Sequence, residues 1–218
     1  LEPALRVVVV ERLQCGSGAS GRNAGFLTKG SALFYQQLIQ KWGAEKALEI
    51  FHYVDESIKL LHQHILAPAE DIDFHPRGSI TLLRSAVSLP EAFGFEPSAK
   101  LPLGLKNFQG SLRSQGEFSI NPMHLMQELK HKLATSGVQI LEAESAFRLS
   151  EDKVQTSSAI IQMDKVVLAM NGYSGEFHPS LKSLIRPYRA QMLALTINQN
   201  ELTLDLHYDP SERVYFRK

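Results

Sequence analysis

The stretch of residues 15–30, which reads C-G-S-G-A-S-G-R-N-A-G-F-L-T-K-G, constrains the fold more than any other part of this chain. It follows the apolar run L-R-V-V-V-V at residues 5–10. A β-branched run without alternation is typical of a strand covered on both faces in a parallel sheet. Ligands of open α/β sheets bind at the carboxyl ends of such strands. The glycine-rich stretch is therefore predicted to be a ligand-binding loop.

Polar groups just before this stretch, and glycines within it, suit a nucleotide cofactor. Glu11 closes the strand, where an acid can accept hydrogen bonds from both hydroxyls of an adenosine ribose. Arg12 could lie along the adenine. Glycines at 16, 18, 21 and 25 permit positive φ and close approach to a phosphate. A flexible Gly/Ser linker is the alternative, but the Arg, Asn and Phe among the glycines favour a ligand loop.

Two strings carry a resemblance to a known family. V-V-V-V-E-R followed by G-A-S-G-R-N-A-G resembles the second strand and flavin loop of FAD-dependent oxidoreductases of the D-amino-acid oxidase superfamily, in the branch with glycine, sarcosine and γ-glutamylputrescine oxidases. V-V-L-A-M-N-G-Y-S-G followed by P-Y-R-A-Q-M resembles its later passage into the substrate sheet. The resemblance implies FAD as cofactor and these contacts with it: Glu11, Arg12, Ser20, Gly21, Arg22, Asn23, Ala24, Gly25, Phe26, Ala146, Phe147, Ala169, Asn171 and Gly172.

The fold implied is α/β (α+β overall), with a Rossmann-like three-layer FAD-binding domain and an antiparallel-sheet substrate domain. We expect residues 1–67 and 119–180 to form the first domain, and 68–118 and 181–218 the second. No G-x-G-x-x-G turn precedes Leu1, and residues 213–218 read as an interrupted strand. We therefore expect the sequence to be incomplete at both ends.

Local patterns predict the elements between these motifs. Apolar spacing indicates helices over 33–42 and 48–65, and Asn121-Pro122 starts a helix that runs to Gly137. Strands are expected at 79–83 and 138–141, a small antiparallel ribbon at 153–163, and a buried strand at 164–170. Residues 85–110 read as a loop. The substrate sheet is expected to take in 80–83, 189–196 and 214–217.

Composition excludes several classes of function. Lys+Arg and Asp+Glu both total 23, so no basic field favours nucleic acid or an anionic membrane. No apolar run reaches about 18 residues, which predicts no membrane span. The single cysteine, Cys15, fits a reducing compartment, and we expect a cytoplasmic protein. The histidines lack ligand-spaced partners, so no metal site is predicted.

No side-chain constellation identifies a catalytic group. By resemblance, the protein oxidises the C–N bond of a small-molecule amine or amino acid by hydride transfer to flavin. Arg77, Arg189, Tyr215 and Arg217 could meet a substrate carboxylate, but none is assigned. Two alternatives remain open: a flavoprotein domain that acts on an aminomethyl group of a modified tRNA base, and a non-catalytic remnant. The sequence indicates neither the oligomeric state nor the electron acceptor.

Overall fold

The computed structural model describes residues 5–29, 31, 33, 35–66, 72–85, 95–98, 107–196 and 206–217. Contacts divide the chain into two compact units. Unit 1 comprises Leu1–Arg22 with Met126–Leu193, and unit 2 comprises Asn23–Leu125 with Ala194–Lys218. The chain thus passes from one unit to the other inside the glycine-rich loop, between Arg22 and Asn23, and again inside helix α3.

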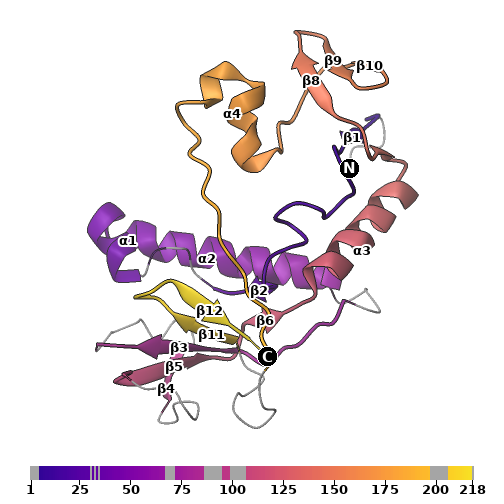
Figure 1. Ribbon diagram of the computed structural model, residues 1–218. Helices are drawn as coiled ribbons and strands as arrows, with labels where there is room; N and C mark the ends of the chain where they lie inside the picture. The colour runs from indigo at the N-terminus through magenta and orange to yellow at the C-terminus, as the bar shows by residue number, and fades with distance from the viewer. Residues whose placement is uncertain are drawn as a thin grey trace. The chain divides into compact units, whose positions relative to one another are not determined.

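Unit 1 is built on a short parallel strand pair. β1 (Val8–Val10) pairs with β7 (Gln139–Leu141), and α3 (Pro122–Thr135) leads into β7. An antiparallel ribbon follows in the order β10-β9-β8, visible in Figure 1. Its strands are β8 (Ala146–Leu149), β9 (Lys153–Thr156) and β10 (Ile160–Gln162). The short helices η3 (Asn171–Tyr173), α4 (Ser174–Phe177) and η4 (Pro179–Leu181) complete the unit.

The two ends of α3 follow the signals in its sequence. The Asn121 side-chain oxygen accepts a hydrogen bond from the backbone N–H of Met123 at 3.0 Å, which satisfies a donor that the first helical turn leaves unpaired. After the helix, Gly137 adopts a φ of 83°, the left-handed conformation that commonly ends a helix. The predicted helix, the strand after it and the ribbon are all confirmed.

Unit 2 contains a five-stranded sheet in the order β12-β11-β3-β5-β4. β11 pairs in parallel with β3, and every other pair in this sheet is antiparallel. Its strands are β3 (Ser79–Leu83), β4 (Phe95–Ser98), β5 (Gly110–Ser114), β11 (Leu206–Asp209) and β12 (Val214–Phe216). A separate antiparallel pair joins β2 (Phe26–Leu27) to β6 (Phe118–Ser119).

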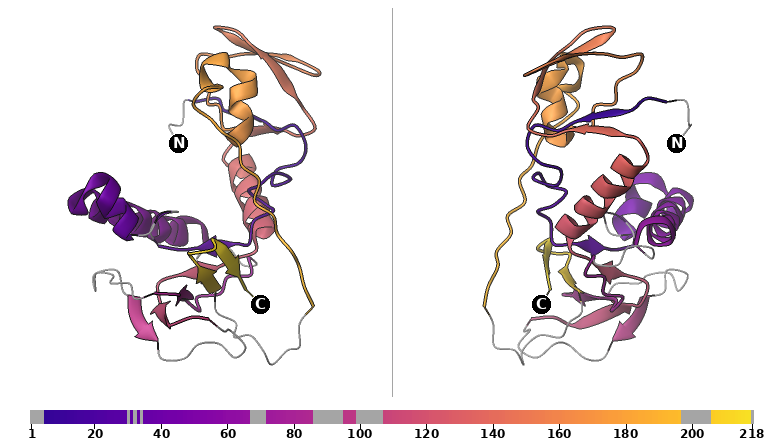
Figure 2. Two further views of the ribbon diagram at one scale, coloured as in Figure 1. Left: turned by 60° about the vertical axis from the view of Figure 1, so that its left-hand side comes forward. Right: turned by 90° about the vertical axis from the view of Figure 1, so that its right-hand side faces the viewer.

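The helices of unit 2 lie along one side of this sheet (Figure 2). They are α1 (Tyr35–Trp42), α2 (Ala44–Leu61) and the π-helical turn η1 (His62–Leu66), close to the predicted ranges. One core cluster joins α1 to α2 through Tyr35, Leu38, Ala47 and Phe51. A second forms around Leu66, Ile72 and Ile120, with Leu27 of β2 packed against it. The second cluster therefore supports the last part of the glycine-rich stretch.

Two predicted strands are wrong. Residues 164–170 and 189–196 form no ladder with any described strand, although each contains an apolar run. Val167 is 87% exposed and Leu193 is 82% exposed. A run of apolar residues becomes a strand only where a neighbour supplies hydrogen bonds, and the described part of the chain places none beside either segment.

Two further expectations need correction. The loop predicted over 85–110 contains strand β4, while residues 86–94 and 99–106 lie outside the described part. Pro97 lies in β4 and is tolerated because β4 is the edge strand of its sheet. β1 was expected to be buried on both faces, but Val8 is exposed and Val9 is half-buried. Among the described strands, β7 alone pairs with β1, so the run is only partly covered.

Candidate functional site

Glu11 lies where β1 ends, as the sequence predicts. Its backbone N–H donates to Leu141 O at 2.9 Å, and its carbonyl accepts from Glu144 N at 3.0 Å, so the loop after β7 is held against it. One carboxylate oxygen accepts from Leu13 N at 2.9 Å. The other has no hydrogen-bond partner among the described residues. Glu11 therefore presents an acceptor at the carboxyl end of a parallel strand pair.

Arg12 brings a second predicted region to the same place. Its guanidinium carbon lies 5.3 Å from the ring centroid of Tyr173, a cation–π contact. Tyr173 directly follows Asn171 and Gly172 in η3. A side chain at Gly172 would bring its Cβ within 2.9 Å of Pro187 Cβ, so this turn packs closely. Unit 1 thus assembles the predicted residues at 11–12 and 171–172.

The first half of the glycine-rich loop is a series of turns in unit 1. Ser17 N donates to Gln14 O at 2.9 Å, and Arg22 N donates to Ala19 O at 3.3 Å. Gly16 has a φ of 88°, a conformation that side-chain-bearing residues rarely adopt. Ser20 and Arg22 are exposed and Gly21 is half-buried. The loop therefore carries a hydroxyl and a guanidinium on its surface.

The segment at 144–147 is tied to the turn between β9 and β10. The Glu144 carboxylate accepts from Ser158 N at 2.6 Å and from Ser158 Oγ at 2.8 Å. Ala146 pairs with Thr156, and the register shifts between Ala146 and Arg148, which leaves the exposed Phe147 as a bulge. Ala169 is exposed in the extended segment before η3. Among the residues predicted here, Ala146 is paired in the β8–β9 ladder, whereas Phe147 lies outside its regular pairing.

Glu142 is a structural residue that the prediction missed. Its carboxylate accepts from Cys15 N at 2.7 Å and from Lys130 Nζ at 2.6 Å, and so joins the start of the glycine-rich loop to α3. The Lys130 ammonium and the Cys15 amide lower the pKa of this carboxyl to about 2. The signal was present in the sequence, because Glu142 directly follows a predicted strand as Glu11 does.

This low pKa predicts acid sensitivity. A carboxyl whose pKa is lowered on folding stabilises the folded state above its unfolded pKa, near 4.3, and loses that contribution as the pH falls toward about 2. Thermal unfolding between pH 5 and pH 2.5 should therefore show a shallower acid decline in Glu142→Gln than in the parent. Glu151→Gln, at an exposed residue of the same unit, should follow the parent. Parallel curves for Glu142→Gln and the parent would refute this linkage.

The second half of the loop belongs to unit 2 and is held by β6. The Asn23 side-chain oxygen accepts from Gly25 N at 2.8 Å, which closes a tight turn around the half-buried Ala24. Gly25 is buried, has a φ of 70°, and its carbonyl accepts from Ile120 N at 2.9 Å. Phe26 follows in β2, and its ring meets Tyr215 edge-on at 5.3 Å between centroids. Unit 2 thereby brings the predicted flavin loop against the predicted substrate sheet.

The family model for FAD-dependent oxidoreductases (DAO) matches residues 1–218, the whole chain. The chain belongs to the FAD-dependent oxidoreductase family. FAD is the cofactor of this family, so the resemblance and the cofactor expected from the sequence are confirmed. The chain spans about half the length of the curated relatives it matches.

Individual relatives agree with this assignment. A probable oxidoreductase, OrdL, from Rhizobium meliloti (strain 1021) is 24% identical over 211 residues, which cover 88% of this chain and 49% of the relative. Glycine oxidase from Geobacillus kaustophilus has a TM-score of 0.54 at 18% identity, over 78% of this chain and 50% of that structure. L-proline dehydrogenase from P. horikoshii has a TM-score of 0.63 at 12% identity, over 98% of this chain and 60% of that structure. These likenesses confirm the predicted fold class.

The chemistry of the residues present fits FAD. Glu11 has an open acceptor for a ribose hydroxyl, and Arg22 offers a cation for a phosphate. Gly16 and Gly25 adopt the positive φ angles that allow backbone to approach a ligand closely. No group of three or more His, Cys, Asp or Glu within the described ranges is placed to hold a metal ion. No helix in the part of the chain described combines the length and apolarity needed to cross a membrane.

Proposed function

We propose that the protein containing this chain oxidises the C–N bond of a small amine or amino acid. The match of the family model to the whole chain is the observation that carries the proposal. The names glycine oxidase and L-proline dehydrogenase, borne by two structures of similar fold, supply the substrate class. When bound, FAD supplies hydride-accepting chemistry. The C–H bond beside nitrogen would release hydride while nitrogen forms a C=N bond and gives up a proton to solvent, and water would hydrolyse the resulting imine.

The residues of this chain would bind and orient rather than react. We assign Glu11 to the adenosine ribose, Arg12 to the adenine, and the loop residues Ser20 to Phe26 to the pyrophosphate and the flavin side. Residues 146–147, Ala169 and 171–172 are proposed to line the nucleotide. We keep 1–67 with 119–180 as the FAD-binding domain and 68–118 with 181–218 as the substrate domain. No catalytic residue is proposed.

A modified tRNA base is the competing substrate, and the charge of the chain does not favour it. The equal totals of 23 basic and 23 acidic residues give no positive field to attract a phosphate backbone. Glycine oxidase and L-proline dehydrogenase, two structures of similar fold, are named for amino acids. A binding titration with tRNA would separate the two classes, because salt-sensitive binding is expected only for the nucleic-acid substrate.

The test of the proposal is an absorption spectrum of the purified full-length protein, followed by an amine screen under anaerobic conditions. We expect flavin bands between about 350 and 500 nm that bleach when a suitable amine or amino acid is added. A colourless protein that does not take up added FAD would refute flavin binding. A flavin that no amine or amino acid reduces would refute the substrate class alone.

A further inference from the structure

The buried carboxylate of Glu117 binds the backbone at the end of the predicted flavin loop. Two residues after β2, the backbone N–H of Lys29 donates to one oxygen of Glu117 at 2.7 Å. Glu117 is only 2% exposed and lies just before β6, the partner strand of β2. Burying a carboxylate is costly unless hydrogen bonds satisfy it. The presence of an acidic residue at this buried position therefore calls for a role other than packing.

The second oxygen of Glu117 connects this segment to the five-stranded sheet. It accepts a hydrogen bond from the hydroxyl of Ser79, the first residue of β3. The Glu117 backbone carbonyl also accepts from Gly78 N at 3.0 Å. Gly78 has a φ of 80°, and a Cβ there would overlap the carbonyl of Ser114 on β5. One acidic residue thus joins the segment after β2 to the start of β3.

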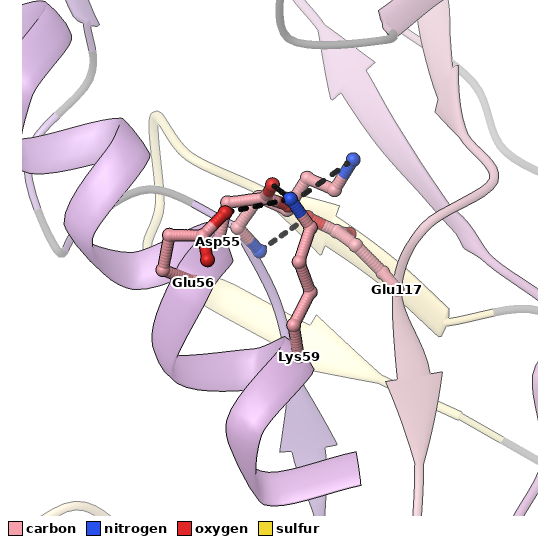
Figure 3. A network of polar contacts seen from close by, with 5 residues as sticks. Asp55, Glu56, Lys59 and Glu117 are labelled. Atoms are coloured by element: carbon pink, nitrogen blue, oxygen red, sulfur yellow. Dashed lines mark hydrogen bonds and ion pairs between the residues drawn. The ribbon is translucent and has the colours of Figure 1, made fainter. Parts of the chain in front are cut away.

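The Lys29 side chain extends the same network to helix α2. Its ammonium lies 3.7 Å from the Asp55 carboxylate, and Asp55 also pairs with Lys59 at 2.9 Å. A side chain at Gly116 would bring its Cβ within 2.6 Å of Lys29 Nζ, so the absence of one makes room for the lysine. Figure 3 shows Asp55 and Lys59 of α2 in the same close-up as Glu117. The segment after β2 is therefore fixed to both a helix and a sheet.

Burial dominates the charge balance at this point. Desolvation raises the pKa of Glu117, although the hydrogen bonds from Ser79 and Lys29 and the charge of Lys29 oppose the rise. An apolar residue would avoid this cost. What an apolar residue cannot do is bind the Lys29 amide and the Ser79 hydroxyl together. The feature specific to Glu117 is that it fixes the position of the backbone.

We propose that Glu117 is a positioning residue for the flavin loop: through the Lys29 amide it fixes strand β2, and hence Phe26 against Tyr215, for flavin binding. This inference rests on the proposed function. On the other side of β2, the carbonyl of Gly25 accepts a hydrogen bond from Ile120 N. Strand β2 is therefore a short segment held by hydrogen bonds both before and after it. Removing the hydrogen bond between Lys29 N and Glu117 should make the position of Phe26 less fixed, without removing any group assigned to the cofactor.

The experiment compares the full-length protein with its Glu117→Ala and Glu117→Gln variants, using Glu45→Ala on the exposed surface of α2 as control. The readouts are hydrogen exchange of the peptide spanning 26–29, the FAD dissociation constant and the visible circular dichroism of bound flavin. Glu117→Ala leaves the partly buried N–H of Lys29 without its acceptor, so we expect the hydrogen exchange of 26–29 and the FAD dissociation constant each to rise about tenfold, with an altered flavin spectrum. In Glu117→Gln, the amide can accept from Lys29 and donate to Ser79, so all three readouts should stay near the parent values.

Each outcome decides the proposal. Unchanged FAD affinity and flavin spectrum in Glu117→Ala, with faster exchange of 26–29, would overturn it and leave Glu117 a purely structural group. If Glu117→Ala does not fold, Ser79→Ala removes a single hydrogen bond, and smaller changes in the same direction are expected. If Ser79→Ala then leaves the FAD dissociation constant unchanged, the proposal is overturned. A parent protein that binds no FAD would instead refute the proposed function itself.

Discussion

Gly25→Ala is expected to unfold unit 2 locally and to abolish FAD binding, the largest effect of any single substitution in the loop. A Cβ at this position would overlap the carbonyl oxygen of Ile120 and lie 3.2 Å from Pro122 Cδ. The φ of 70° adds strain for any residue except glycine. Left-handed strain costs about 1–2 kcal/mol and overpacking about 1–3 kcal/mol, so the free energy of unfolding should fall by about 2–5 kcal/mol.

The matched control is Gly18→Ala in the same loop. No atom lies within 4 Å of a Cβ built at Gly18, and its φ is outside the positive range. Its free energy of unfolding should therefore stay within about 0.5 kcal/mol of the parent value. Chemical denaturation of both variants, followed by FAD titration, measures the contrast. Equal stability of the two would show that the Gly25 backbone does not make this close approach in solution.

The contrast between these glycines also shows what the sequence could and could not predict. The pattern G-S-G-A-S-G-R-N-A-G marked a loop rich in glycines, and the structure gives several of them turn conformations. Nothing in that pattern separates Gly25 from Gly18, because the difference is the carbonyl of Ile120, a residue remote in the chain. Local sequence reports that a backbone is permissive but not which neighbour requires it.

The same reasoning applies to Glu117. It lies in the string S-Q-G-E-F-S, where no local pattern marks a buried acid, and its two side-chain contacts are with residues 38 and 88 positions away. Glu142 differs, because an acid at the end of a predicted strand is the feature that drew attention to Glu11. Long-range polar pairs cannot be read from a local pattern, whereas acids at strand ends can.

Secondary structure followed the same division. The helices α2 and α3 were predictable because their apolar spacing lies within the segments themselves, and α3 also has the Asn121 cap directly before it. Residues 166–170, V-V-L-A-M, are an apolar run as β1 is, but a strand also needs a neighbour. β1 has β7 beside it, and residues 164–170 have no partner among the described strands.

The second large effect is expected at Glu11. Glu11→Gln keeps an oxygen that can accept from Leu13 N, so the turn after β1 should persist. It removes the charge and the second acceptor, which we assign to a ribose hydroxyl. Hydrogen bonds to charged groups contribute about 1.5–3 kcal/mol, so the FAD dissociation constant of the full-length protein should rise about 10- to 100-fold.

Two measurements distinguish a Glu11 that binds the ribose from a Glu11 that only stabilises the turn after β1. If Glu11 binds ribose, Glu11→Gln should weaken FAD while its denaturation midpoint in the absence of FAD matches the parent. If Glu11 only holds the turn, the midpoint should fall and the affinity of the folded fraction should be unchanged. Glu151→Gln, an exposed residue between β8 and β9, should alter neither quantity. Because the carboxylate already binds Leu13 through one oxygen, a selective loss of FAD affinity would assign the ribose to the other.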